Sequence, residues 1–294
     1  MRLTDRRYAM ALIAPAALFL VVFVAWPLVR LVYDSFFDIS PIGGAREFIG
    51  LDNYSQILAS PTFQGAAGRT LAYTAIVITF EFILGFAVAL LFSALGSKSA
   101  VFRTIFLYPL MIAPVVAGLL WRFLLIDNLG IVNSLLHRAG LIGSPGDIGW
   151  LSDPSIVLWA VAIPDIWLTT SFMTLVIFAG LQNVPGDVLE AARLDGASFP
   201  TLLGRIIIPL LRPVIAVALI VRGIDAAKAF DIILIQTGGG PQNASQTLSL
   251  LIHQTMVRFG DPGQASAMGT VYLLAMMVVA GLAVWFIWRP GAKS

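Results

Sequence analysis

Long apolar runs alternate with short polar segments along this chain, and their lengths predict helices that cross a membrane. A spanning helix needs ~20 consecutive, mostly apolar residues. Six windows meet this requirement: Ala9 to Val32, Leu71 to Leu95, Thr104 to Ile126, Ile156 to Leu181, Ile206 to Ile235 and Ala265 to Trp288. A signal peptide is an alternative for the first window, but its apolar run is too long and no small-residue cleavage site follows it. The pattern therefore predicts an all-α membrane protein with six transmembrane helices.

Composition supports a lipid environment and excludes several kinds of site. Hydrophobic residues make up 59% of the chain and charged residues 12%, with a mean hydropathy of +0.90. A soluble domain carries roughly a quarter charged residues. The net charge of +2 gives no indication of nucleic acid as a partner. The absence of cysteine removes disulfides and thiolate chemistry, and two distant histidines, His137 and His253, predict no metal site.

The distribution of lysine and arginine predicts that both termini are cytoplasmic. On this orientation nine of these residues lie in the inner segments and four in the outer loops, and positive charge favours the cytoplasmic side. The predicted organisation is a cytoplasmic N-terminus (1–8), a first transmembrane helix (9–33) and a periplasmic loop (34–70). A five-helix core (71–288) and a cytoplasmic C-terminus (289–294) follow.

One inner segment is longer and more polar than the others. The stretch "VPGDVLEAARLDGASFP" reads as a loop followed by a short helix, since Pro185 and Asp187 suit a helix start and the next residues are good helix formers. Gly196 permits a left-handed exit. Pro209 and Pro213 predict a kinked or delayed start to the fifth transmembrane helix. From physical chemistry alone, an ordinary cytoplasmic loop remains an equal alternative.

A resemblance adds to this interpretation. Glu190-Ala191-Ala192, Asp195-Gly196-Ala197, Ile206, Pro209 and Pro213 resemble the EAA motif of ABC importer permeases. The resemblance implies a type I (MetI-like) permease fold, with a coupling helix within residues 184–200 that docks on a separate ATPase subunit. Leu203 stands where the family often has an aromatic residue, and it keeps an apolar docking side chain. The residues to which the resemblance gives an ATPase-coupling role are Glu190, Ala191, Ala192, Asp195, Gly196, Ala197, Leu203 and Pro209.

Further stretches resemble the carbohydrate branch of the same family. They are "FIGLDNYSQIL", "GIVNSLLHRAGLI" with "WLSDPS", and "AFDIILIQTGGGPQNASQTLSLLI". The resemblance implies uptake of a sugar or polyol across a bacterial inner membrane. The implied partners are a second homologous permease, an ATPase dimer, and a periplasmic or lipid-anchored substrate-binding protein, with membrane lipid around the helices.

No stretch matches the phosphate loop G-x-x-x-x-G-K-[ST]. The chain is therefore expected to hold no cofactor and no catalytic residue, with ATP and Mg bound by the partner ATPase. Energy for active transport then has to arrive through contact, and the polar inner segment is the predicted port.

Charged residues inside the spans need an explanation, because each costs ~2.5–3.5 kcal/mol or more at the bilayer centre. Arg222, Asp225, Lys228 and Asp231 follow one another at intervals of three with alternating sign, which predicts a self-compensated stripe along the fifth helix. The stripe either lines the substrate path or forms an ion-pair ladder against the partner subunit. Glu81 and Asp165 are lone acids, which either line a cavity or hydrogen-bond Arg122 or another polar group.

Four aromatic residues in the spans, Trp121, Trp159, Trp167 and Phe172, present flat faces suited to stacking on sugar rings. Packing within the membrane is the commoner role of such residues. The alternative function is an ion-coupled secondary transporter, in which Glu81, Asp165 and the charges of the fifth span relay protons. No internal symmetry of the kind common in such transporters is visible, and no arrangement of residues resembles a catalytic centre.

Overall fold

A computed structural model of the chain describes residues 3–39 and 44–287. The described residues are mainly helical, as the hydrophobic pattern predicts. The chain divides into two compact units, one formed by residues 1–64 and 251–277 and the other by residues 65–250 and 278–294. The C-terminal tail (289–294) and the predicted end of the sixth span at Trp288 lie outside the described residues.

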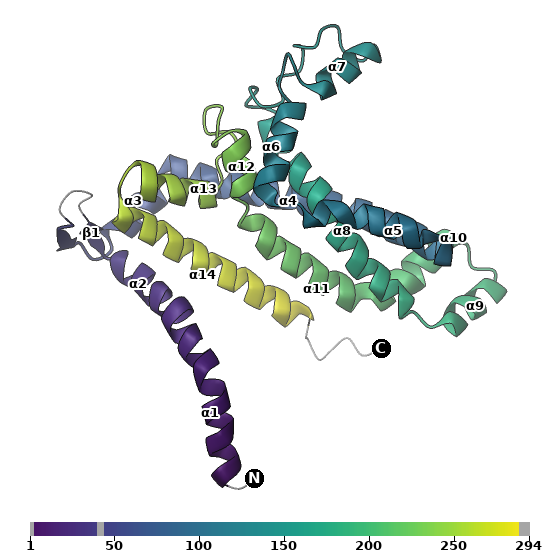
Figure 1. Cartoon of the computed structure of the whole chain (residues 1–294), viewed down its shortest axis with the longest axis horizontal. Helices are drawn as coiled ribbons and strands as arrows, with labels where there is room; N and C mark the ends of the chain where they lie inside the picture. Colours follow the sequence, from purple (N-terminus) through teal and green to yellow (C-terminus); the bar gives the residue numbers. More distant parts are fainter. Residues whose placement is uncertain (1–2, 40–43, 288–294) are drawn as a thin grey trace. The chain divides into compact units, whose positions relative to one another are not determined.

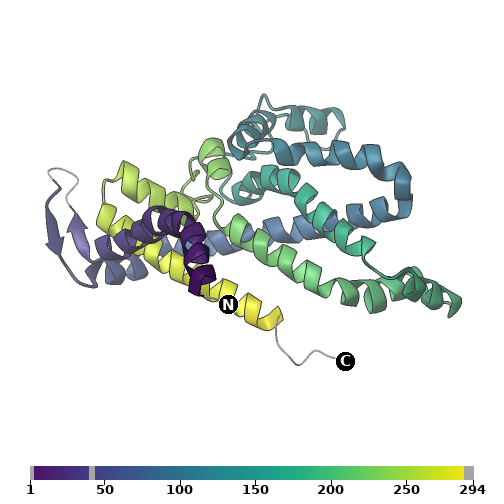
Figure 2. The ribbon, with the colours of Figure 1, turned by 60° about the horizontal axis from the view of Figure 1, so that its bottom comes forward.

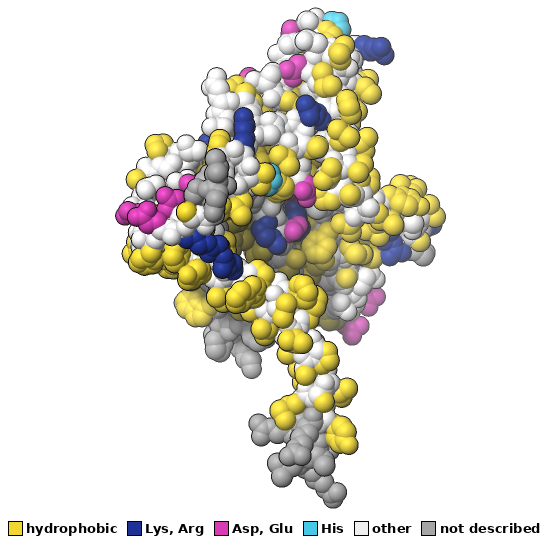
Figure 3. All heavy atoms as spheres, turned by 60° about the vertical axis from the view of Figure 1, so that its left-hand side comes forward, with side chains coloured by type: hydrophobic (Ala, Val, Ile, Leu, Met, Phe, Trp, Pro, Cys, Tyr) yellow, Lys and Arg dark blue, Asp and Glu magenta, His cyan; other side chains and the backbone are white. Residues whose placement is uncertain are grey.

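The first unit begins with an apolar helical segment. Helix α1 (Leu3–Leu20), a π-helical turn (Val21–Ala25) and α2 (Trp26–Asp34) follow one another without a break. None of the hydrophobic window within Met10–Asp34 is buried, and Leu12 and Phe23 are 81% and 66% exposed. Figure 3 shows hydrophobic side chains, in yellow, along the lower projection that this segment forms. This span therefore needs lipid or another protein to cover its surface.

A short β-hairpin and a helix follow in the same unit. Strands β1 (Phe37–Ile39) and β2 (Arg46–Phe48) form an antiparallel hairpin, a minor departure from the predicted all-α class (Figure 2). The Asn53 amide of α3 (Asp52–Ala59) donates to the carbonyls of Ser35 and Phe37. At Gly263, near the start of α14 (Pro262–Ile287), a Cβ atom would lie 2.2 Å from the Phe37 carbonyl oxygen. Only glycine fits there, so the hairpin, α3 and α14 meet at this point.

The second unit carries the remaining helices (Figure 1). They are α4 (Pro61–Leu95, which begins in the first unit), α5 (Ala100–Leu107), α6 (Pro114–Leu124), α7 (Ile131–Arg138), α8 (Val157–Gln182), α9 (Gly186–Leu194), α10 (Phe199–Leu202), α11 (Ile208–Ala227), α12 (Asp231–Gln236) and α13 (Leu248–His253, which ends in the first unit). Helices α4, α8 and α11 pack closely, as Gly85 of α4 lies against Met173 and Gly180 of α8 lies against Leu211.

Within residues 3–39 and 44–287, five segments are long and apolar enough to span a membrane, and a bent pair of helices makes a sixth if it counts as one span. That pair occupies the predicted third span. Helices α5 and α6 meet at 95°, because Pro114 lacks an N–H group and favours an extended backbone at Ala113, whose ψ is 137°. The sequence predicts one span from Thr104 to Ile126, and the structure shows two helical segments there with a sharp bend between them.

The predicted fifth span is wrong at its C-terminal end. It was expected to reach Ile235, but α11 ends at Ala227 and a separate helix, α12, begins at Asp231. The apolar run "IILI" belongs to α12, which packs against α6 and α8. The approach to α6 is close, because a Cβ atom at Gly118 would lie 2.5 Å from Cγ2 of Ile235. Hydropathy alone does not separate two short apolar helices from one long helix.

Candidate functional site

The predicted inner helix is present as α9, and its ends have the predicted chemistry. Pro185 precedes the first residue, Asp187 lies in the first turn, and Gly196 takes a left-handed φ of 77°. The Ala197 N–H donates to the Ala192 carbonyl at 2.9 Å, which closes the turn. The helix itself covers Gly186–Leu194, shorter than the predicted segment 184–200 because Gly196 reverses the chain.

One face of α9 is packed and the other is free. Ala192 is buried in a cluster with Leu202, Ile207 and Leu211, and Ala197 and Leu203 pack against the same cluster. Glu190, Ala191 and Asp195 are exposed, and Leu194 is 88% exposed. The buried motif residues therefore pack α9 against the start of the fifth span, and the exposed motif residues form a surface that is open to solvent or to a partner.

The fifth span begins at Phe199, before the predicted Ile206, so the two prolines do not delay its start but lie at and after an interruption of its regular α-helical winding. A π-helical turn (Leu203–Ile207) precedes α11, Pro209 lies in the first turn of α11, and Pro213 lies inside it. Together α10, this turn and α11 form one span from Phe199 to Ala227. A continuous helical segment thus connects the loop after α9 to the charged residues at the far end of α11.

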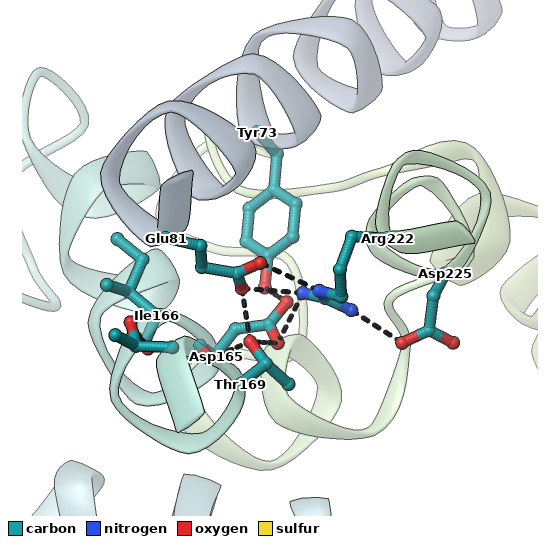
Figure 4. A network of polar contacts seen from close by, with 8 residues as sticks. Tyr73, Glu81, Asp165, Ile166, Thr169, Arg222 and Asp225 are labelled. Atoms are coloured by element: carbon teal, nitrogen blue, oxygen red, sulfur yellow. Dashed lines mark hydrogen bonds and ion pairs between the residues drawn. The ribbon is translucent and has the colours of Figure 1, made fainter. Parts of the chain in front are cut away.

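Those charged residues form a buried cluster around Arg222 (Figure 4). The guanidinium donates to Glu81 twice, from Nε to Oε2 and from Nη2 to Oε1, both at 2.7 Å. Nη2 also donates to Asp165 Oδ1 at 3.1 Å, and Nη1 donates to Asp225 Oδ2 at 2.5 Å. One arginine of α11 therefore connects α4, through Glu81, with α8, through Asp165.

Two hydroxyl groups complete the cluster. The Tyr73 hydroxyl donates to Asp165 Oδ2 at 3.0 Å, and the Thr169 hydroxyl contacts Glu81 Oε1 and the Asp165 carbonyl (Figure 4). Glu81 is fully buried, and the Arg222 and Asp165 side chains are 3% and 9% exposed. Buried charges of this kind are tolerated only with such complete hydrogen bonding. Sequence reasoning missed Tyr73 and Thr169, since nothing along the chain marks them.

The predicted charge stripe is wrong in detail, whereas the prediction that Glu81 and Asp165 hydrogen-bond a polar group of another helix is confirmed, with Arg222 and not Arg122 as the partner. Lys228 directly follows Ala227, the last residue of α11, and Asp231 is the first residue of α12, so the four charges do not share one helix. Of the predicted neighbouring pairs, Arg222–Asp225 forms, whereas within the described residues Lys228 and Asp231 make no ion pair. Glu81 and Asp165 are partners of Arg222, while Arg122 donates to the Ile235 carbonyl at 2.9 Å.

A cavity of about 400 Å³ adjoins the cluster. It is lined by Leu110, Thr169, Phe172, Val221, Arg222, Ile224, Asp225 and Lys228. The Asp225 side chain is 63% exposed and gives one carboxylate oxygen to Arg222. The cavity thus combines a carboxylate, an ammonium group and an aromatic ring, a set able to hold a polyhydroxylated molecule. Asp231 does not line this cavity.

Three of the four aromatic candidates lie elsewhere. Trp121, Trp159 and Trp167 line a separate cavity of about 560 Å³. The Trp121 and Trp167 rings meet edge to face at 6.1 Å, and Trp159 meets Phe80 in the same way at 6.3 Å. Thr170 also lines this cavity, but its hydroxyl donates to the Ile166 carbonyl. These tryptophans pack on other aromatic rings, which is the commoner of the two roles predicted for them. Phe172 alone of the four lines the polar cavity.

Two loops between spans have well-defined polar contacts. The Asn133 amide of α7 donates to the carbonyls of Asp127, Pro145 and Ile148, and its oxygen accepts from Trp150. Arg69 of α4 donates to the Gln246 carbonyl at 2.8 Å, which ties the "TGGGPQNAS" loop to α4. In the described part of the chain, no three His, Asp or Glu residues are grouped to hold a metal ion.

One family of known proteins matches most of the chain. Residues 81–289 match the family described as "Binding-protein-dependent transport system inner membrane component". The chain is 39% identical to the sulfoquinovosyl glycerol transport system permease protein SmoG of Agrobacterium fabrum, over 95% of this chain and 90% of the relative. It is 33% identical to the trehalose/maltose transport system permease protein MalF of Thermococcus litoralis, over 94% and 91%.

Solved structures show the same fold. A chain of a bacterial ABC transporter involved in the import of the acidic polysaccharide alginate superposes with a TM-score of 0.84 at 22% identity, covering 98% of this chain and 97% of the other. A second structure contains the alginate transporter in complex with an alginate pentasaccharide-bound periplasmic protein, with a TM-score of 0.81 at 22% identity, covering 95% of this chain and 93% of the other.

Proposed function

Because the chain belongs to the family of binding-protein-dependent transport system inner membrane components, we propose that it forms one half of the transmembrane pathway of a bacterial importer for a sugar or polyol. The chain is a multi-pass membrane permease of the ABC importer class, and the ion-coupled alternative is not favoured. The names of its relatives, sulfoquinovosyl glycerol and trehalose/maltose permeases, support a carbohydrate substrate. The inner membrane and cytoplasmic termini are part of the proposal.

The proposed partners follow from the family. A second homologous permease forms the other half of the pathway, an ATPase dimer that binds ATP and Mg drives it, and a periplasmic or lipid-anchored binding protein delivers the substrate. The capture of alginate by a periplasmic protein in a transporter of the same fold supports the last of these. The permease itself holds no cofactor in this scheme and catalyses no reaction.

The observation that carries the coupling role is the two-sided construction of α9. Its exposed face carries Glu190, Ala191 and Asp195, and its buried face is fixed to the start of α11 through Ala192. In the proposal, the ATPase binds the exposed face and moves α9 together with the segment 199–227. The movement then reaches Arg222 and the polar cavity at the far end of α11.

In the polar cavity, Asp225 and Lys228 are the proposed substrate contacts. Their carboxylate and ammonium groups accept from and donate to sugar hydroxyls, while the Phe172 ring offers a stacking face. Arg222, Glu81 and Asp165 are proposed to hold the three helices around this cavity. Asp231 remains a proposed path residue on α12, outside the cavity.

Crosslinking tests the coupling role directly. The chain contains no cysteine, so Ala191→Cys introduces a single thiol on the exposed face of α9. We expect it to crosslink to the ATPase subunit, whereas the matched variant Arg138→Cys on α7 gives no such product. A thiol at Ala191 that reacts only from the periplasmic side, or ATP-independent uptake by the chain alone, contradicts the proposal.

A further inference from the structure

A third cavity lies between α4, α5 and α8, away from the polar cavity of Arg222. Its volume is about 350 Å³, within the range of ~300–1,000 Å³ typical of ligand pockets. Phe92 of α4, Phe106 of α5 and Phe178 of α8 form an aromatic wall. Phe92 meets Phe106 at 5.8 Å and Phe178 at 6.3 Å, both edge to face. The cavity is therefore apolar over most of its surface.

One cation stands beside this apolar wall. The Arg103 guanidinium lies over the Phe178 ring, 4.9 Å from its centroid. Within residues 3–39 and 44–287, Arg103 forms no ion pair and its guanidinium makes no hydrogen bond to protein. The two threonine hydroxyls of the lining donate within their own helices, Thr104 to Ala100 and Thr174 to Thr170. Arg103 thus brings an uncompensated positive charge and several donors to the cavity.

The position of the cavity decides which molecule fits. It lies at the end of the long apolar helix α4 and at the start of α5, both within candidate spans. Arginine side chains at the ends of spans reach toward lipid headgroups, and basic pockets between transmembrane helices bind anionic headgroups. A sugar needs several paired polar groups, which this lining does not offer. A hydrocarbon chain next to a phosphate matches both the apolar wall and the charge.

We propose that this cavity binds a membrane phospholipid, with an acyl chain against Phe92, Phe106 and Phe178 and its phosphate on Arg103. On the predicted orientation, the lipid belongs to the cytoplasmic leaflet. The site is separate from α9 and from the polar cavity, so it does not rest on the proposed transport function. Charge complementarity favours an anionic headgroup, such as phosphatidylglycerol, over a zwitterionic one.

Lipid binding to the full chain in detergent tests the proposal, with native mass spectrometry as the measurement. The probes are phosphatidylglycerol and phosphatidylcholine. We expect phosphatidylglycerol to bind tighter, and Arg103→Gln to weaken its binding about tenfold, the order expected for a lost charge-assisted contact. Arg103→Lys is expected to keep most of the affinity. Ala100→Trp, at an exposed position of the lining, is expected to fill the cavity and weaken binding of both lipids.

A control variant and a competing anion test whether the headgroup and the acyl chain both contribute to binding. Arg138→Gln removes an exposed arginine from α7 and is expected to leave lipid binding unchanged. Equal binding of the two lipids, or an equal loss in Arg138→Gln and Arg103→Gln, overturns the proposed headgroup contact. Displacement of the lipid by inorganic phosphate alone overturns the acyl-chain part. Failure of the assembled importer to retain any lipid that depends on Arg103 shows that a protein surface occupies the cavity, and it overturns the proposal as a whole.

Discussion

Replacing Arg222 by methionine removes the only cation that contacts the two buried acids within the described residues. The Glu81 side chain is fully buried and the Asp165 side chain is 9% exposed, so neither carboxylate gains water when the guanidinium is lost. Removing one partner from a buried ion pair typically costs about 3–5 kcal/mol. Methionine keeps helix propensity and much of the side-chain volume. We therefore expect Arg222→Met to lower the free energy of unfolding by about 3–5 kcal/mol.

The three carboxylates are not expected to contribute equally. Glu81 accepts two bonds of 2.7 Å in a fully buried position, whereas the Asp225 side chain is 63% exposed. Water screens an exposed pair, which contributes only about 0–1 kcal/mol. Glu81→Met is thus expected to destabilise the chain several times more than Asp225→Asn does. The double variant Glu81→Met with Arg222→Met is expected to be less damaging than the sum of the two single changes.

Unfolding of the purified chain in mixed micelles, followed by circular dichroism against the fraction of denaturing detergent, measures these differences. The double-mutant cycle between Glu81 and Arg222 is expected to give a coupling of about 0.5–3 kcal/mol. The exposed Arg258→Met is the control and is expected to stay within about 0.5 kcal/mol of the parent chain. A coupling below this range, or an effect of Asp225→Asn equal to that of Glu81→Met, refutes the assignment of Arg222 as the link between α4 and α8.

Two further substitutions test the packing around the site. Gly118→Val places a side chain against Ile235 Cγ2, where even a Cβ atom would lie at 2.5 Å. We expect overpacking to lower the free energy of unfolding by about 1–3 kcal/mol in the same assay. An unchanged free energy of unfolding would contradict the observed contact of α6 with α12. Asn133→Ala removes the amide that donates to three backbone carbonyls between residues 127 and 148. We therefore expect faster proteolysis in residues 127–150. Ser134→Ala is the control, because it removes only a hydrogen bond to the nearby Gly130 carbonyl.

The sequence located the features that depend on local pattern. Apolar length located the candidate spans, and the order of proline, acid and glycine identified α9. These signals work because helix ends and membrane crossings are set by residues close together in the chain. The sequence shows Pro114, which indicates that a helix is interrupted there, but it does not show the angle between the two helices. The size of the bend, 95°, cannot be read from a single proline, and the packing of α6 against α8 and α12 involves residues far apart in the chain.

The sequence did not predict the buried cluster around Arg222, because its members are far apart along the chain. Glu81 and Arg222 are 141 residues apart, and Asp165 and Arg222 are 57 apart. Spacing along one helix predicted pairs among Arg222, Asp225, Lys228 and Asp231, and only the first of these pairs forms. A buried arginine takes its partners from whichever helices pack around it, and the sequence of one helix does not contain that information. Tyr73 and Thr169 also contact the cluster through the packing of their helices, which the sequence does not show.

The length of α4 has a consequence for the surrounding bilayer. Its 35 residues rise ~52 Å at ~1.5 Å each, against a hydrocarbon thickness of ~30 Å. Even a tilt of ~40°, at the upper end of what is usual, leaves ~10 Å of helix beyond the acyl chains. Arg69 lies eight residues from the start of α4 and holds the loop before Thr247 by its backbone. Thinning or thickening of the host bilayer would change the inclination of α4, and through Arg69 it would shift that loop without any ligand or nucleotide.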